Sequence, residues 1–173
     1  MRRLLAATLV LVPALAGRPE SARSKEANER RREAIAREMV ALATEIRRDI
    51  ERGDAAALVA RVPADGLRCG DRVVPRDRIA RDLRSDRSWL HGVLFGGTGY
   101  APPPGTFPSL AALFRSAQEV AVVVSFQPDP RAGPEGRPCL EFRSKASGTP
   151  GAPLCFERRG DRWWFAESLY PCG

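Results

Sequence analysis

Four cysteines in a chain of 173 residues limit the folds open to this sequence more than any other feature. They are Cys69, Cys139, Cys155 and Cys172, and none of them belongs to a Cys-x-x-Cys pair. Zinc sites and redox motifs need such close pairs, whereas an even number of separated cysteines is typical of disulfide-bonded domains in oxidising compartments. We therefore expect two disulfides and no metal site, and four cysteines leave three pairings open.

The N-terminus indicates the oxidising compartment that such disulfides require. Arg2 and Arg3 precede an apolar stretch over residues 4–15, which runs into the small-x-small cleavage sequence Ala14-Leu15-Ala16. This order is typical of a secretory signal peptide, and the stretch is shorter than the roughly 20 residues that a membrane-spanning helix needs. We predict a signal peptide over 1–16, no transmembrane segment after cleavage, and a protein that is exported, either periplasmic or secreted.

The charge of the chain narrows the range of partners. The mature chain loses Arg2 and Arg3 from the 28 basic residues and keeps all 21 acidic ones, so its basic excess is small. The arginines alternate with Asp and Glu almost everywhere, and aromatic residues are not set among them as platforms on which bases could stack. Nucleic-acid binding rests on phosphate contacts from basic side chains, so we expect no nucleic-acid partner.

The mature domain opens with an amphipathic helix over 24–52, because its apolar residues recur every three or four positions. These residues are Ile35, Met39, Leu42, Ile46 and Ile50. Gly53 ends this helix and Asp54 caps a second one over 55–61, since glycine adopts left-handed conformations and aspartate accepts hydrogen bonds from backbone donors.

After a flexible lead-in over 17–23, we predict a single domain over 24–173 with helices first and strands later, an α+β order. Beyond the first two helices we expect strands over 66–69 and 72–74, helices over 76–84 and 109–117, and strands over 119–126, 139–144, 154–158 and 162–170. The Val-Ala-Val-Val-Val run predicts a buried strand over 119–126. The segment 88–95 is open between helix and strand. The glycine- and proline-rich loop over 96–108 is long enough to be a lid or a binding edge.

Four short sequences carry a resemblance to a known superfamily. They are Gly53-Asp54-Ala55-Ala56-Ala57-Leu58-Val59, Asp65-Gly66-Leu67, Pro75-Arg76-Asp77-Arg78-Ile79-Ala80 and Gly160-Asp161-Arg162-Trp163-Trp164-Phe165. In order and spacing they resemble the nuclear transport factor 2-like, or cystatin-like, superfamily over nearly the whole mature chain. The resemblance implies an α+β fold whose N-terminal helices pack in a strongly bent antiparallel sheet, cone-like and with an apolar pocket. Members use this pocket to bind a ligand or partner, or to isomerise or hydrate small apolar molecules.

The last hairpin predicts which side chains face that pocket. If Gly160-Asp161 is a two-residue turn, side-chain alternation gathers four apolar residues on one face of the hairpin. These candidate ligand-binding residues are Leu154, Phe156, Trp163 and Phe165. Glu167 falls on the same face, where apolar surroundings could raise the pKa of its carboxyl toward that of a general acid or base. His91 and Tyr100 are the other catalytic candidates.

Two functions remain open for such a domain. The first is non-catalytic binding of an apolar small molecule or of an envelope protein, and no sequence motif indicates a cofactor. The alternative is a pocket enzyme, an isomerase or a hydratase-like lyase, that uses Glu167 with Tyr100 or His91. The strand over 120–126 has no ionisable residue, so the paired pocket acids of the steroid-isomerising members have no place in it. We therefore favour binding over catalysis.

Side-chain alternation also selects one disulfide. Cys139 and Cys155 both point away from the apolar face of their strands, so they can meet across adjacent strands. The second pair follows if the resemblance places the early strand with Cys69 beside the last strand, which ends before Cys172. We predict the pairs Cys139–Cys155 and Cys69–Cys172.

Overall fold

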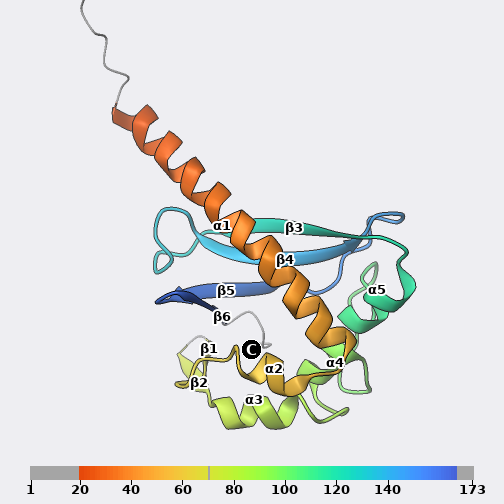
Figure 1. Cartoon of the computed structure of the whole chain (residues 1–173). Helices are drawn as coiled ribbons and strands as arrows, with labels where there is room; N and C mark the ends of the chain where they lie inside the picture. Colours follow the sequence, from red (N-terminus) through yellow and green to blue (C-terminus); the bar gives the residue numbers. More distant parts are fainter. Residues whose placement is uncertain (1–19, 70, 167–173) are drawn as a thin grey trace, which may run out of the picture.

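The computed structural model describes residues 20–69 and 71–166 (Figure 1). The predicted signal peptide, Glu167 and Cys172 lie outside the described residues. Within these ranges the helices come first and the main strands follow, in agreement with the predicted α+β order. The elements are α1 (Glu20–Glu51), α2 (Ala55–Val59), β1 (Leu67–Cys69), β2 (Arg72–Val74), α3 (Arg76–Asp82), α4 (Trp89–Phe95), α5 (Leu110–Ser116), β3 (Val120–Gln127), β4 (Arg137–Ser144), β5 (Leu154–Arg159) and β6 (Arg162–Phe165).

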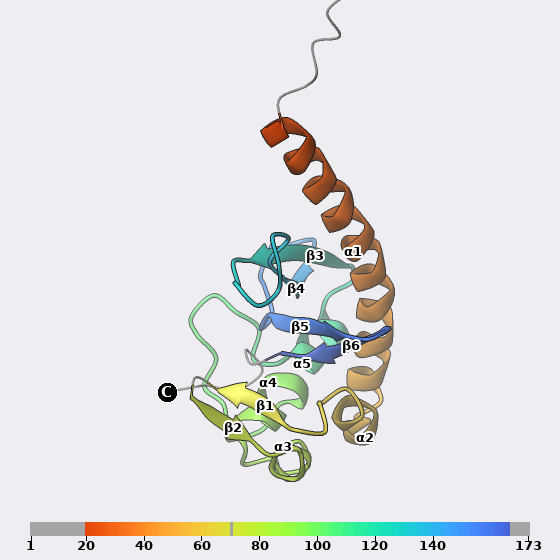
Figure 2. The same ribbon diagram turned by 90° about the vertical axis from the view of Figure 1, so that its left-hand side faces the viewer.

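Helix α1 turns its apolar stripe toward the rest of the domain. It begins at Glu20, earlier than predicted, and ends before Gly53, whose φ of 67° is left-handed. Met39, Ile46 and Ile50 are at most 1% exposed, which confirms the buried stripe. The N-terminal part of the helix extends past β3, whereas the rest packs against α5 and the sheet (Figures 1 and 2).

Capping side chains fix where the shorter helices begin. Asp54 caps α2 and Ser109 caps α5, each by accepting a hydrogen bond from a backbone N–H in the first turn. Ser88 does the same for α4, with its hydroxyl oxygen 3.0 Å from the backbone nitrogen of His91. The segment 88–95, which the sequence leaves open between helix and strand, is therefore helical.

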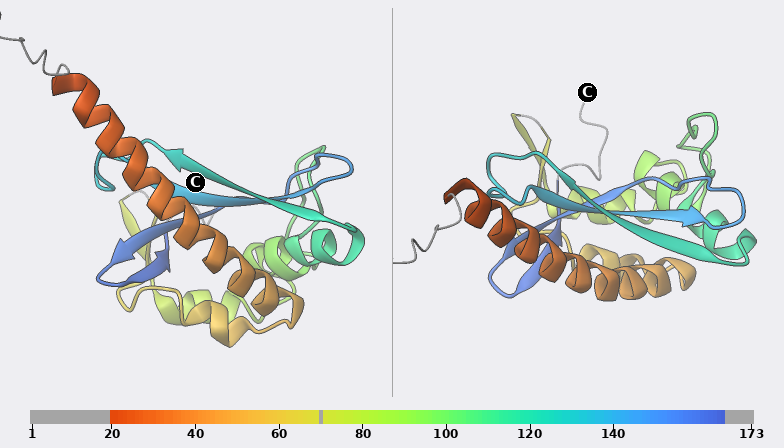
Figure 3. Two further views of the ribbon diagram at one scale, coloured as in Figure 1. Left: turned by 45° about the horizontal axis from the view of Figure 1, so that its top comes forward. Right: turned by 90° about the horizontal axis from the view of Figure 1, so that it is seen from above.

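The strands form two antiparallel sheets. β1 and β2 make a short hairpin, and β3, β4, β5 and β6 lie side by side in chain order. Each residue of β3 from Val120 to Gln127 pairs with one residue of β4, without a bulge. Bulges and glycine kinks are what bend a sheet strongly. The sheet is accordingly neither closed nor strongly curled (Figure 3), so the cone expected from the resemblance is wrong.

Strand β3 is the edge of the four-stranded sheet, which corrects the prediction of a buried strand. Val122 and Val123 belong to opposite faces, yet they are 36% and 38% exposed. The reason is that β3 has a neighbouring strand on one side only. The apolar run thus predicts the strand correctly but not its position in the sheet.

The last hairpin has the predicted register. Phe156 stands opposite Phe165 across β5 and β6, and their rings stack with centroids 5.2 Å apart. Both side chains are fully buried, and Leu154 is 1% exposed in the same core. This pairing confirms that the chain reverses at Gly160, whose φ is 63°.

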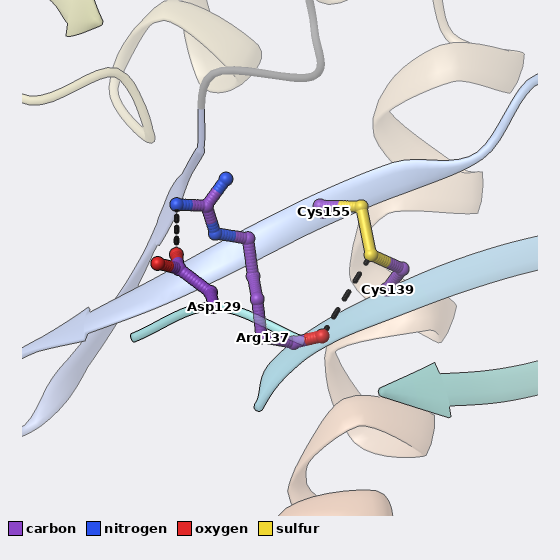
Figure 4. Close-up of a disulfide and its surroundings, with 4 residues drawn as sticks. All are labelled: Asp129, Arg137, Cys139 and Cys155. Atoms are coloured by element: carbon purple, nitrogen blue, oxygen red, sulfur yellow. Dashed lines mark hydrogen bonds and ion pairs between the residues drawn. A yellow bond between two sulfur atoms is a disulfide. The ribbon is translucent and has the colours of Figure 1, made fainter. Parts of the chain in front are cut away.

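Cys139 and Cys155 are bonded to each other across β4 and β5, as predicted (Figure 4). With Ala166 they form a small buried cluster that is separate from the main core, because they point to the other face of the sheet. The pair Cys69–Cys172 stays a prediction, since Cys172 lies outside the described residues.

Candidate ligand-binding cleft

A cleft of about 550 Å³ opens between the β5–β6 hairpin, the residues 66–68 around the start of β1, and the loop over 128–136 that joins β3 to β4. Three of the predicted ligand-binding residues, Phe156, Trp163 and Phe165, line it. The fourth, Leu154, is buried in the core instead. The hairpin therefore supplies one wall of the cleft, with residues from both of its faces, since Glu157 and Arg159 line it as well.

The floor of the cleft consists of side chains that the fold itself buries. Phe156 and Phe165 are fully buried there, and Leu67 beside them is 2% exposed. Ile35 of α1 and Trp163 of β6 are only half-buried. These two are the large apolar side chains of the cleft that a bound molecule can touch.

Arginines outnumber acids on the rim of the cleft. The basic residues are Arg68, Arg131, Arg137, Arg158 and Arg159, and the acidic residues are Asp129, Glu135 and Glu157. A cleft lined by an excess of one sign of charge attracts ligands of the opposite sign. Asp65 and Glu38, outside the cleft lining, pair with Arg159 and Arg158, so the local excess of positive charge is small.

An ion pair between Asp129 and Arg137 closes the loop end of the cleft, with side chains only 10% and 11% exposed (Figure 4). The Asp129 carboxylate also accepts a hydrogen bond from the backbone nitrogen of Arg131 at 3.0 Å. That hydrogen bond, together with the positive charges of Arg137 and Arg131, lowers the pKa of Asp129. The carboxylate thus stays ionised and acts as a fixed partner of Arg137.

At the hairpin end of the cleft, Arg159 lies between two carboxylates. Its guanidinium is 2.6 Å from Asp65 and 2.6 Å from Glu157. The hydrogen bond from Arg159 is the main reason that the pKa of Asp65 is lowered. Arg158, next along the strand, pairs with Glu38 of α1 at 3.3 Å. These ion pairs tie the hairpin both to α1 and to the segment before β1.

Arg68 differs from the other arginines of the rim. It is exposed on β1, and its side chain makes no hydrogen bond or ion pair with any residue in the ranges 20–69 and 71–166. A guanidinium binds a carboxylate or phosphate through two parallel hydrogen bonds. Arg68 is therefore the cation of the cleft that is available to an anionic ligand.

The predicted catalytic candidates do not gather in the cleft. His91 lies in α4, where its Nδ1 donates to the carbonyl oxygen of Leu83 at 2.8 Å. Tyr100 packs its ring edge-to-face against Trp89, with centroids 5.6 Å apart. Neither residue lines the cleft. Glu167 lies outside the described residues, so its predicted role is not tested.

The loop over 96–108, expected to be a lid or a binding edge, supplies no residue to the cleft. Its backbone is fixed at both ends. The nitrogen of Thr98 donates to the carbonyl of Asp86 at 3.0 Å, and the nitrogen of Phe107 donates to that of Pro150 at 3.0 Å. The loop is thus bound to the body of the domain away from the cleft.

The sequence does not identify the loop over 128–136 as part of the cleft, because its prolines and glycines are typical of a linker. Helix α1 gives the loop its position. The Asn28 side chain donates to the carbonyl of Pro134 at 3.1 Å, and Arg31 forms an ion pair with Glu135. Two carboxylates, Asp129 and Glu135, within a proline- and glycine-rich segment between long strands are the signal that points to such a rim.

Comparison with protein-family models, with curated proteins and with solved structures gives no match to this chain. The superfamily resemblance therefore rests on the order and spacing of its four short sequences. Among the described residues, no group of three or more His, Cys, Asp or Glu side chains is placed to hold a metal ion. Within the same part of the chain, the helices are too short or too polar to cross a bilayer.

Proposed function

We propose that this protein is an exported, non-catalytic binding domain whose cleft holds an apolar molecule with an anionic group. The observation that carries the proposal is the presence of Arg68 in the same cleft as the half-buried Trp163. The Arg68 side chain makes no hydrogen bond or ion pair with the residues that the structure describes. An arginine beside an apolar floor suits a ligand that has both kinds of surface.

The apolar part of the ligand would lie against Ile35 and Trp163. Both side chains keep part of their surface exposed in the cleft. Removing apolar surface from water contributes about 25 cal/mol per Å². A ligand that covers these two residues therefore gains affinity without any change in the buried floor beneath them.

The anionic part of the ligand would bind Arg68. The acids of the rim are already paired with other arginines, so they do not compete for Arg68. The pairs are Asp129 with Arg137, Glu135 with Arg31, and Glu157 with Arg159. The charge of Arg68 helps to lower the pKa of Asp65, but that carboxylate is held by Arg159, so Arg68 presents to the cleft a charge with no ion-pair partner among the described residues. A carboxylate or phosphate group on the ligand would compensate it.

The same ion pairs favour binding over catalysis. A general acid or base works best when its pKa lies near the working pH. The pKa of Asp129 is lowered instead, and Glu135 and Glu157 are held by arginines. These carboxylates therefore act as structural anions in the rim.

The rim is also fixed before any ligand arrives. Arg31 pairs with the side chain of Glu135, and Arg32 donates to its backbone carbonyl at 2.9 Å. These contacts hold the loop over 128–136 against α1. A preformed cleft binds without the cost of ordering a loop, which supports a small-molecule site.

Mass spectrometry of small molecules released from the natively exported protein tests this proposal. We expect an acidic, largely apolar molecule from the wild-type protein and much less of it from Arg68→Gln. Arg72→Gln is the matched control, because Arg72 is exposed on the neighbouring strand β2 and its loss changes the charge equally. A neutral or cationic molecule that both variants retain would contradict the proposal.

A further inference from the structure

A second hollow, of about 510 Å³, is lined by residues from the C-terminal end of α1, from the segment that follows α3, and from α4 and α5. It shares no lining residue with the cleft described above. Ile50, Leu83 and Ala111 are buried beneath it. The floor is therefore apolar, and the half-buried His91 and Phe95 of α4 also line the hollow.

The rim carries three arginines from three separate elements. Arg52 follows α1, Arg84 follows α3, and Arg115 lies in the last turn of α5. They are far apart in the sequence, and the packing of the helices brings them to one hollow. Their exposed side chains leave the hollow accessible from solvent.

None of these arginines is neutralised by the described part of the chain, residues 20–69 and 71–166. The side chains of Arg52, Arg84 and Arg115 make no hydrogen bond or ion pair there. The one acid of the rim, Glu51, is held by Arg47 at 2.8 Å. Positive charge is thus concentrated around the hollow.

A role at the helix ends explains each arginine singly. A cation near the C-terminus of a helix offsets the partial negative charge of the last carbonyl groups. That role requires neither a shared hollow nor the absence of acids from it. The convergence of Arg52, Arg84 and Arg115 on one rim is the additional observation.

We propose that this hollow is a phosphate-binding site. Guanidinium groups match the oxygens of a phosphate through paired, charge-assisted hydrogen bonds. All three line the same hollow. The phosphate can be free inorganic phosphate or the headgroup of an anionic phospholipid, because the rim is exposed to both.

The test compares two double variants of equal charge. Arg84→Gln with Arg115→Gln removes two arginines of the rim. Arg37→Gln with Arg72→Gln removes two exposed arginines that lie outside the hollow and also lack partners among the described residues. Any effect of net charge alone is therefore the same in both proteins.

Binding is measured in two arms, by calorimetry with inorganic phosphate and by sedimentation with vesicles of phosphatidylglycerol and phosphatidylcholine. We expect the rim variant to bind about 100-fold more weakly, since each charge-assisted interaction contributes about tenfold. The control should stay within about threefold of the wild-type protein. Binding to phosphate and vesicles identifies the phosphate group itself as the ligand, and binding to vesicles alone identifies a lipid headgroup.

Equal binding by the two variants in both arms, or no binding by the wild-type protein in either, would overturn the proposal. A rim variant that loses thermal stability but keeps its affinity would show that the arginines serve only the helix ends. If the rim variant folds poorly, NMR of the wild-type protein tests whether the rim arginines bind the phosphate group. Phosphate or vesicles must then shift the side-chain Nε–H signals of Arg84 and Arg115 and leave those of Arg37 and Arg72 in place, and unshifted rim signals would overturn the proposal.

Discussion

The indole Nε1 of Trp163 donates a hydrogen bond to the carboxylate of Glu38, 2.7 Å away and 125 residues earlier in the chain. Arg158 pairs with the same carboxylate at 3.3 Å, and its guanidinium lies 5.6 Å from the centroid of the Trp163 ring. One carboxylate of α1 therefore holds two side chains of the last hairpin. The orientation of Trp163 in the cleft depends on this contact.

Replacing Glu38 should loosen the hairpin. Glu38→Ala is expected to lower the free energy of unfolding by about 1 kcal/mol, because it removes a half-exposed hydrogen bond and ion pair. Glu33→Ala, on the same helix and without a partner among the described residues, should change it by less than about 0.5 kcal/mol. Urea denaturation monitored by tryptophan fluorescence measures the free energy of unfolding of both variants. Equal effects would show that Glu38 does not hold the hairpin.

The bond between Cys139 and Cys155 should contribute strongly to stability. It closes a loop with a sequence separation of 16, for which the chain-entropy model gives about 3 kcal/mol. The Cys139→Ala, Cys155→Ala double variant should lose about this free energy of unfolding in urea. A loss below about 1 kcal/mol would contradict that contribution.

Peptide mapping without reduction tests the second predicted pair. We expect a peptide that links Cys69 to Cys172. That bond would close a loop of about a hundred residues and contribute about 4–5 kcal/mol, more than the shorter bridge. A peptide that links Cys69 to Cys139 or to Cys155 would refute both predicted pairs.

The ion pair of Asp129 and Arg137 should make stability depend on acid pH. Because the pKa of Asp129 is lowered in the folded state, the pair stabilises the fold above the pKa of an unfolded aspartate, about 3.9. That stabilisation is lost as the pH falls through the lower folded-state value. The urea midpoint of the wild-type protein should exceed that of Asp129→Asn above about pH 5, and the gap should close toward about pH 2. A gap that stays constant over this range would contradict the role of the carboxylate.

Local patterns in the sequence predict most of the elements and the register of the hairpin that forms one wall of the cleft. The apolar spacing of Met39, Ile46 and Ile50 predicts the buried stripe of α1, because a helix repeats its faces every three or four residues. The tight turn at Gly160 fixes the register that sets Phe156 opposite Phe165. Both features depend on residues close together in the chain.

The features that the sequence does not predict depend on contacts between distant segments. The exposure of Val123 follows from the order of the strands in the sheet, which an apolar run does not encode. Arg68 belongs to a cleft that the loop over 128–136 also lines, and Arg31 holds this loop in position by its ion pair with Glu135. Neither arginine can be told from the chain's other arginines by its sequence neighbours.

A fluorescence titration with 1-anilinonaphthalene-8-sulfonate, an apolar anion, tests the proposed use of the cleft most directly. The wild-type protein should show saturable binding, with energy transfer from tryptophan to the bound probe. Arg68→Gln should weaken the binding about tenfold, because it removes a charge-assisted interaction, and Arg72→Gln should leave it within about twofold. Equal affinities for the wild-type protein, Arg68→Gln and Arg72→Gln would contradict the assignment of the cleft as a site for apolar anions.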